Sequence, residues 1–103
     1  MPAYMVIEAE ISTTEPLREQ FKKYAAAAAK LVVEFGGEYI VRGAPPHSLE
    51  GDWQLETKLV ISKWVSKDEA LAFWNSPEYA MVKKLRLGTA NVRVTLFEGV
   101  DEE

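Results

Sequence analysis

Apolar and polar residues alternate along residues 3–11 and again along 91–98, which is the period of a β-strand with two different faces. The segments 38–42 and 57–65 are further strand candidates, and the first of them is short. Residues 17–35 instead place apolar side chains three and four apart, as does a second stretch that begins after Ser66, and this spacing is typical of amphipathic helices. The pattern predicts the element order βαββαβ.

Local signals indicate where the helices begin and end. Glycines at 36–37 end the first helix, and Ser66 with Glu69 three residues on forms a capping box that starts the second. Pro77 cannot continue that helix because it lacks the backbone donor and clashes with the preceding turn. Ser76 can cap a new helix with Pro77 at its first position, so we expect a helix-to-helix corner here.

Two β-α-β halves of this kind interleave into a four-stranded antiparallel sheet with the helices on one face, an α+β ferredoxin-like fold. We expect one domain over residues 1–100 and a short acidic tail at 101–103. Four strands about 4.8 Å apart and about 17 Å long leave roughly 300 Å² of sheet uncovered, close to the size of an interaction patch. A two-fold axis lets one patch cover another copy, so a homodimer is predicted.

The uncovered face should carry Tyr4, Val6, Glu8 and Glu10, which mix apolar and acidic types. Two carboxylates do not belong in a dry interface, so either solvent or a cavity lies between the two sheets.

Composition narrows the function classes. The 103 residues include no cysteine, which excludes disulfides, thiolate nucleophiles and cysteine-based metal centres. The net charge of −4 offers no basic surface for nucleic acid. We find no signal-peptide pattern and no apolar run of the roughly 18 residues that span a membrane, so a cytoplasmic protein is expected.

Four short strings are more specific than composition: MPAY, GGEYIVRG, LEGDW and FWNSPEY. With their spacing, they resemble the bacterial family called domain of unknown function 1330, in the dimeric α+β barrel superfamily, over about residues 1–100. The resemblance implies a ferredoxin-like protomer whose sheet packs against that of a second copy. It implies no established reaction. Related barrels include cofactor-independent monooxygenases, isomerases, decarboxylases and haem-degrading enzymes, so the fold permits an enzyme without choosing its chemistry.

The resemblance also carries over recurrent polar and aromatic positions: Arg42, Gly43, Glu50, Gly51, Trp53, Asn75, Ser76, Pro77 and Tyr79. Two positions depart from the pattern. Leu55 stands where the family often has proline, and Lys58 where it has arginine, which implies another loop path and the loss of a bidentate carboxylate contact.

Arg42, Glu50 and Trp53 lie in or beside the long segment 43–56, and each has two interpretations. Arg42 either binds a carboxylate at a cavity mouth or pairs with Glu50 across the loop. Trp53 either packs back onto the domain after a turn or, with Trp74, forms an aromatic wall of a ligand pocket. In the second case Glu50 or Asp52 is the proton carrier.

The corner at Ser76 and Pro77 directs Asn75 and Tyr79. They either cap and pack or donate hydrogen bonds to a carbonyl or enolate oxygen. Arg86 either complements a helix C-terminus or binds an anionic substrate. The single histidine, His47, follows two prolines in the loop, with no nucleophile or second ligand near it, so we expect no metal site, no haem and no other cofactor.

Two hypotheses follow. In the first, the protein binds a small, partly apolar, carbonyl- or carboxylate-bearing molecule in a cavity between the sheet and the long loop. If such a protein is catalytic, the reaction is cofactor-free proton transfer or oxygenation, with Glu50 as base, Tyr79 and Asn75 as hydrogen-bond donors, and Arg42 orienting the substrate. Trp53, Trp74 and Arg86 complete this candidate site. In the second, the protein is a non-catalytic module in which the same polar groups cap helices and fill a dimer interface. An open pocket reaching Arg42 and Tyr79 would favour the first hypothesis, and mutual hydrogen bonds in filled space the second.

Overall fold

The computed structural model describes residues 1–53 and 57–100. Along the chain it contains β1 (Ala3–Ile11), α1 (Leu17–Glu34), β2 (Glu38–Arg42), β3 (Thr57–Trp64), α2 (Lys67–Trp74), α3 (Pro77–Lys83), the 3-10 turn η1 (Lys84–Arg86) and β4 (Ala90–Glu98). The predicted order βαββαβ is confirmed, with the second helical segment divided at the Ser76-Pro77 corner.

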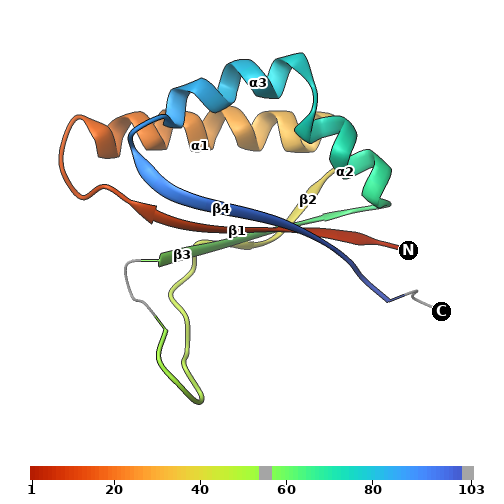
Figure 1. The fold of residues 1–103 in the computed structure, drawn as a ribbon, viewed down its shortest axis with the longest axis horizontal. Coiled ribbons are helices and arrows are strands. Elements are labelled where there is room, and N and C mark those ends of the chain that lie inside the picture. The colour runs from red at the N-terminus through yellow and green to blue at the C-terminus, as the bar shows by residue number, and fades with distance from the viewer. Residues whose placement is uncertain (54–56, 101–103) are drawn as a thin grey trace.

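The four strands form one antiparallel sheet in the order β2-β3-β1-β4. Helices α1, α2 and α3 all lie on the same side of it (Figure 1). Register decides which residues share a face. Val6 lies opposite Ile61 of β3 and Thr95 of β4, so these three side chains point to the face without helices. This is the ferredoxin-like arrangement that the sequence predicts.

Helix ends follow local sequence chemistry. Gly36, at the end of α1, has a φ of 93°, a left-handed conformation that glycine adopts without steric cost. Ser66 caps α2 by accepting the backbone N–H of Glu69 at 3.2 Å. Ser76 caps α3 by accepting the N–H of Tyr79 at 3.0 Å, and its own hydroxyl donates to the Phe73 carbonyl at 2.7 Å. The two bonds of Ser76 therefore fix the corner on both sides.

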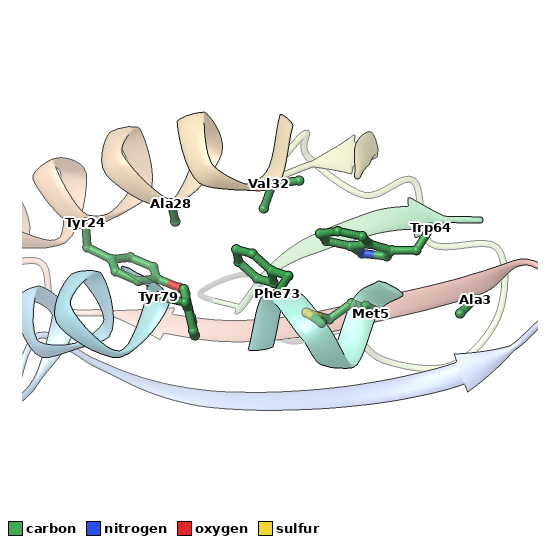
Figure 2. Close-up of a cluster of buried hydrophobic side chains, with 9 residues drawn as sticks. Ala3, Met5, Tyr24, Ala28, Val32, Trp64, Phe73 and Tyr79 are labelled. Atoms are coloured by element: carbon green, nitrogen blue, oxygen red, sulfur yellow. The ribbon is translucent and has the colours of Figure 1, made fainter. Parts of the chain in front are cut away.

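The core lies between the helices and the sheet (Figure 2). Trp64 at the end of β3 is 1% exposed, and its ring stacks on Phe73 of α2 with centroids 5.2 Å apart. A Cβ atom on Gly37 would lie 2.7 Å from the Trp64 ring, so only glycine lets β2 begin this close to the indole. Large aromatic side chains thus fill the end of the layer where α2 packs.

The loop from residue 43 to 53 leaves β2 and extends away from the sheet on the side opposite the helices (Figure 1). Leu49 in this loop is 91% exposed. The radius of gyration is 14.2 Å, against about 13 Å for a compact domain of this length. The sheet with one bare face and the projecting loop explain the difference.

Candidate functional site

A cavity of about 300 Å³ lies between α1 and the helix side of the sheet. Its walls are mostly apolar, with Phe21, Ala25 and Ala28 from α1 facing Ile7, Val60 and Val92 from the strands. The alanines belong to the run 25–29, which favours helix but fills little space against the sheet. The volume is at the small end of the range for ligand pockets. The alanine run thus leaves room under α1 that larger residues would occupy.

Two tyrosine hydroxyls meet at the inner end of this cavity. The phenol oxygens of Tyr24 in α1 and Tyr79 in α3 are 2.8 Å apart, and both residues are buried (Figure 2). Tyr24 lines the cavity itself, whereas Tyr79 lies behind it, where packing leaves only about 10 Å³. Because the Ser76 cap holds the backbone of Tyr79, the corner positions the second hydroxyl and, through it, the first.

Arg86 brings a positive charge to the same group. Its guanidinium carbon is 5.4 Å from the centroid of the Tyr24 ring, a cation-π distance. The Nε–H of Arg86 is buried and has no hydrogen-bond partner within residues 1–53 and 57–100. Unsatisfied buried donors are uncommon in folded proteins, so this N–H needs an explanation.

Burial governs the protonation of the tyrosines. It raises the pKa of Tyr24 well above the ordinary value, the neighbouring Tyr79 raises that pKa further, and Arg86 opposes the change. Burial also raises the pKa of Tyr39, against the effect of Arg42. Both phenols are therefore neutral at physiological pH and can donate hydrogen bonds, which makes Tyr24 a poor base and a good partner for an oxygen atom.

The opposite end of the cavity opens beside β2 and β3. Arg42, Gly43 and Lys58 line it there, and both charged side chains are exposed. The Arg42 guanidinium carbon is 4.8 Å from the centroid of the Tyr39 ring, which also lines the cavity. Within residues 1–53 and 57–100, Arg42 and Glu50 form no ion pair, and the Arg42 guanidinium contacts the Tyr39 ring instead.

Of the seven predicted site residues, Arg42 lines this cavity, and two more contact Tyr24, which lines it. Arg42 lies at its mouth, and Tyr79 and Arg86 contact Tyr24 at its inner end. Trp74 packs against Tyr79, with ring centroids 5.2 Å apart. The Lys83 ammonium nitrogen lies 4.5 Å from the centroid of the Trp74 ring. Trp74 therefore supports Tyr79 and does not line the cavity.

The other three residues lie elsewhere. Glu50 is exposed in the loop that extends on the side opposite the helices, and it does not line the cavity. Trp53 follows it, and its indole N–H donates to the Thr57 carbonyl at 3.3 Å. Asn75 is the C-cap of α2, with its backbone N–H on the Leu71 carbonyl. One protomer therefore does not gather all seven residues into one pocket.

Trp53 separates two hollows on the bare face of the sheet. One, of about 460 Å³, also contains Glu8, Glu10 and Arg93, and the other, of about 260 Å³, contains Pro45 and Leu59. Glu8 pairs with Arg93 at 3.3 Å. The predicted acidic residues thus lie on the uncovered side, beside open space.

Metal ligands do not cluster in the described parts of the chain, residues 1–53 and 57–100. His47 is exposed in the loop. Within the same residues, no helix has both the length and the apolar character that crossing a bilayer requires.

Tyr24 and Tyr39 are absent from the sequence-based site. Tyr24 belongs to the apolar stripe of α1, where a core residue and a cavity wall have the same spacing. The available signal is chemical, because a tyrosine placed in a core needs a hydrogen-bond partner for its hydroxyl. That partner, Tyr79, is 55 positions away.

The sheet, the one-sided helices and the polar-ended cavity define an α+β protein of the ferredoxin-like class. The sequence model of a family described as domain of unknown function (DUF1330) matches residues 2–100, and the chain belongs to that family. No curated protein matches the sequence.

Solved structures share the fold at low sequence identity. A dimeric ferredoxin-like protein of unknown function from Jannaschia sp. CCS1 has a TM-score of 0.74 at 15% identity, covering 96% of this chain and 100% of that one. A protein of unknown function from Rhodopseudomonas palustris has a TM-score of 0.71 at 16% identity, covering 98% and 84%. SnoaB, a cofactor-independent oxygenase from Streptomyces nogalater, has a TM-score of 0.67 at 12% identity, covering 98% and 95%.

Proposed function

We propose that the protein binds a small, mostly apolar molecule that carries a carbonyl, enol or phenol oxygen, in the cavity between α1 and the sheet. The observation that carries this proposal is the Tyr24–Tyr79 hydroxyl pair at the inner end of that cavity. Pockets with apolar walls and a few directed polar groups are typical of small-molecule sites.

The hydroxyl pair can direct a hydrogen bond into the cavity. If the Tyr79 O–H donates to the Tyr24 oxygen, the Tyr24 O–H is left to donate to the ligand, and the first bond strengthens the second. Arg86 beside the Tyr24 ring favours negative charge on that side of the cavity. A ligand oxygen that gains negative charge would therefore be held best.

The same arrangement limits the chemistry that we propose. No Asp, Glu or His is among the described residues that line the cavity, and Glu50 belongs to the loop that extends on the other side of the sheet. The proposal therefore includes no catalytic base from the protein, and it does not keep the role of base that the sequence suggested for Glu50. Catalysis would need a ligand that ionises readily by itself, such as an acidic enol or phenol, with Tyr24 stabilising the resulting oxyanion. The cofactor-independent oxygenase SnoaB, which has the same fold, supports oxygenation of such a molecule.

Ligand binding is tested with naphthol, in the isomer whose hydroxyl lies at one end of the long axis of the two fused rings. We expect it to raise the melting temperature, because a ligand bound only to the native state stabilises the fold. Ala25→Leu should abolish this shift by filling the cavity, and Ala26→Leu should keep it, since Ala26 is exposed one position along α1 and does not line the cavity. Equal shifts in both variants would reject this binding site.

Tyr24→Phe separates the hydroxyl from the shape of the cavity. It should weaken binding of the naphthol about fivefold to tenfold, in line with one hydrogen bond, while naphthalene itself binds both proteins equally. Isothermal calorimetry gives both values. Equal weakening for naphthol and naphthalene would mean that Tyr24 only shapes the cavity.

The active form that we propose is a homodimer, in which the bare faces of two sheets pack together. Tyr4, Val6 and Ile61 give this face apolar side chains, and Phe97 is 54% exposed on it. The exposed Leu49 extends from the same side on its loop, where a second sheet would meet it. The dimeric state of the Jannaschia protein supports this assembly. Sedimentation should give twice the chain mass of 11.6 kDa, and a monomer at micromolar concentration would contradict it.

A second candidate function is a non-catalytic interaction module. The observation in its favour is that Ser76 and Tyr79 form hydrogen bonds with each other and with neighbouring residues, and that the packing around Tyr79 leaves little space. Residues with a purely structural role show the same features. If naphthol, naphthoate and naphthalene all leave the melting temperature unchanged while the dimer forms, this second function becomes the better one.

A further inference from the structure

Basic side chains gather at the outer end of the cavity although the chain has a net charge of −4. Arg42 and Lys58 line the mouth, and neither belongs to an ion pair in the described parts of the chain. The composition alone would favour acidic residues here.

A second hollow, of about 530 Å³, continues from this mouth along the N-terminal half of α1. It shares Ile11, Phe21 and Lys58 with the cavity and adds two more cations, Arg18 and Lys22. Within residues 1–53 and 57–100, no Asp or Glu lines either hollow. Four positive side chains therefore follow one continuous groove.

Local structure does not explain these charges. Arg18 is in the first turn of α1, where the helix dipole favours anions and disfavours cations. Arg18 and Lys22 are one turn apart and of like charge, which costs a little helix stability. Neither forms an ion pair with a carboxylate among the described residues. An anion in the groove would give this arrangement a favourable partner.

We infer that the ligand is an amphipathic organic anion, with its apolar body under α1 and a carboxylate or phosphate group at the mouth beside Arg42 and Lys58. This inference rests on the proposed function and adds the substrate class to it. Arg42 offers a planar fork for two parallel hydrogen bonds, and Lys58 adds a second charge. A ligand of this class has one oxygen at Tyr24 and a charged group at the opposite end.

The test uses naphthalene ligands that differ only at their ends. The reference ligand is a hydroxynaphthoate, with its hydroxyl and its carboxylate at opposite ends of the ring system. It is compared with its neutral methyl ester and with the naphthol that lacks the carboxylate. The fourth ligand is the same naphthol with a phosphate ester in place of the carboxylate. We expect the carboxylate or the phosphate to bind about tenfold more tightly than the methyl ester. The tighter of the two charged ligands identifies which anion the groove takes. Added salt should reduce that preference, because the contacts are near the surface.

Variants localise the effect. Arg42→Gln and Lys58→Gln should each weaken binding of the hydroxynaphthoate about fivefold and that of the naphthol by less than about twofold. Lys22→Gln should weaken the phosphate ligand more than the matched control Lys23→Gln, since Lys23 is adjacent on α1 and does not line the groove. Melting temperatures of the free variants verify that each is folded.

The outcomes separate the two proposals. If the naphthol binds through Tyr24 but acid and ester bind equally, the anion inference fails and the proposed function remains. If the ester binds most tightly, or if Lys23→Gln weakens the charged ligands as much as Lys22→Gln, the groove does not select an anion. If no naphthalene ligand binds, both proposals fail.

Discussion

On the helix side of the sheet, Trp64 is 1% exposed and Ala3 is fully buried. On the bare face, Phe97, which pairs with the residue after Ala3, remains 54% exposed. The same strands supply both faces, since successive side chains point in opposite directions. The chain covers the first face with its own helices and leaves the second bare. The helix side is also closed unevenly, tightly packed at Trp64 and hollow under the alanine run of α1. This difference separates the residues that stabilise the protomer from those for which we propose binding.

The largest effect is expected from Trp64→Ala on the helix side. Removing the indole leaves a cavity beside Phe73 and Gly37, at a cost of about 3–5 kcal/mol in the free energy of unfolding. The loss, measured by urea denaturation, should not depend on protein concentration, because the contact lies within one chain.

Val33→Ala is the control, since Val33 is 67% exposed on α1 and its loss should change stability by no more than about 0.5 kcal/mol. A similar small change for Trp64→Ala would mean that the helix layer is not tightly packed at Trp64.

Ile61→Glu on the bare face should act on association instead. A carboxylate placed between two sheets would be buried without a partner, so we expect the dimer dissociation constant to rise at least about a hundredfold, about 2.7 kcal/mol. Sedimentation velocity over a dilution series measures it.

Val33→Glu makes the same chemical change on the outer side of α1 and should leave the dimer intact. If both variants remain dimeric, the interface is elsewhere and the comparison between the faces fails.

The third effect is smaller and concerns the connection between the corner and the cavity. Ser76→Ala removes the bonds to the Tyr79 N–H and the Phe73 carbonyl, and should cost about 1–2 kcal/mol of stability. Because Tyr79 then loses its fixed position, naphthol binding should weaken as well. Ser66→Ala, a cap far from Tyr24, should reduce stability without changing that affinity. Unchanged naphthol affinity in Ser76→Ala would show that the cap has no influence on the site.

The fold was predictable because each of its signals is local. Alternation sets the strands, and Ser76 with Pro77 sets the corner within a few residues. Arg42 was also predictable as a cavity-mouth residue, because it ends a strand immediately before Gly43. These predictions depend on short stretches of chain and on the alternation of side chains between the two faces of a strand.

The site was predictable only in part, since its central contact joins distant positions. Tyr24 and Tyr79 are 55 residues apart, and nothing in the spacing of α1 distinguishes a phenol at a cavity from one in the core. The place of Glu50 was not predictable, because the alternation along a strand says nothing about the path of the long loop that follows it. Residues 54–56, including the departure at Leu55, lie outside the described residues.

The smallest effect, and the one most specific to the cavity, is expected from Tyr24→Phe in the free protein. At neutral pH it should cost about 1 kcal/mol, the value of one hydrogen bond. Burial raises the pKa of Tyr24 in the folded protein above its ordinary value of about 10, so in alkaline solution the native state holds a proton that the unfolded state has lost. Stability from this group is therefore fully present below about pH 10 and declines as pH rises further, by at most about 1.4 kcal/mol per pH unit. Tyr24→Phe should make the decline of the wild-type protein less steep, as measured by urea denaturation from neutral to alkaline pH. Parallel curves for the two proteins would show that the Tyr24 hydroxyl is in contact with water, and the cavity would then lack the dry inner end on which oxygen binding depends.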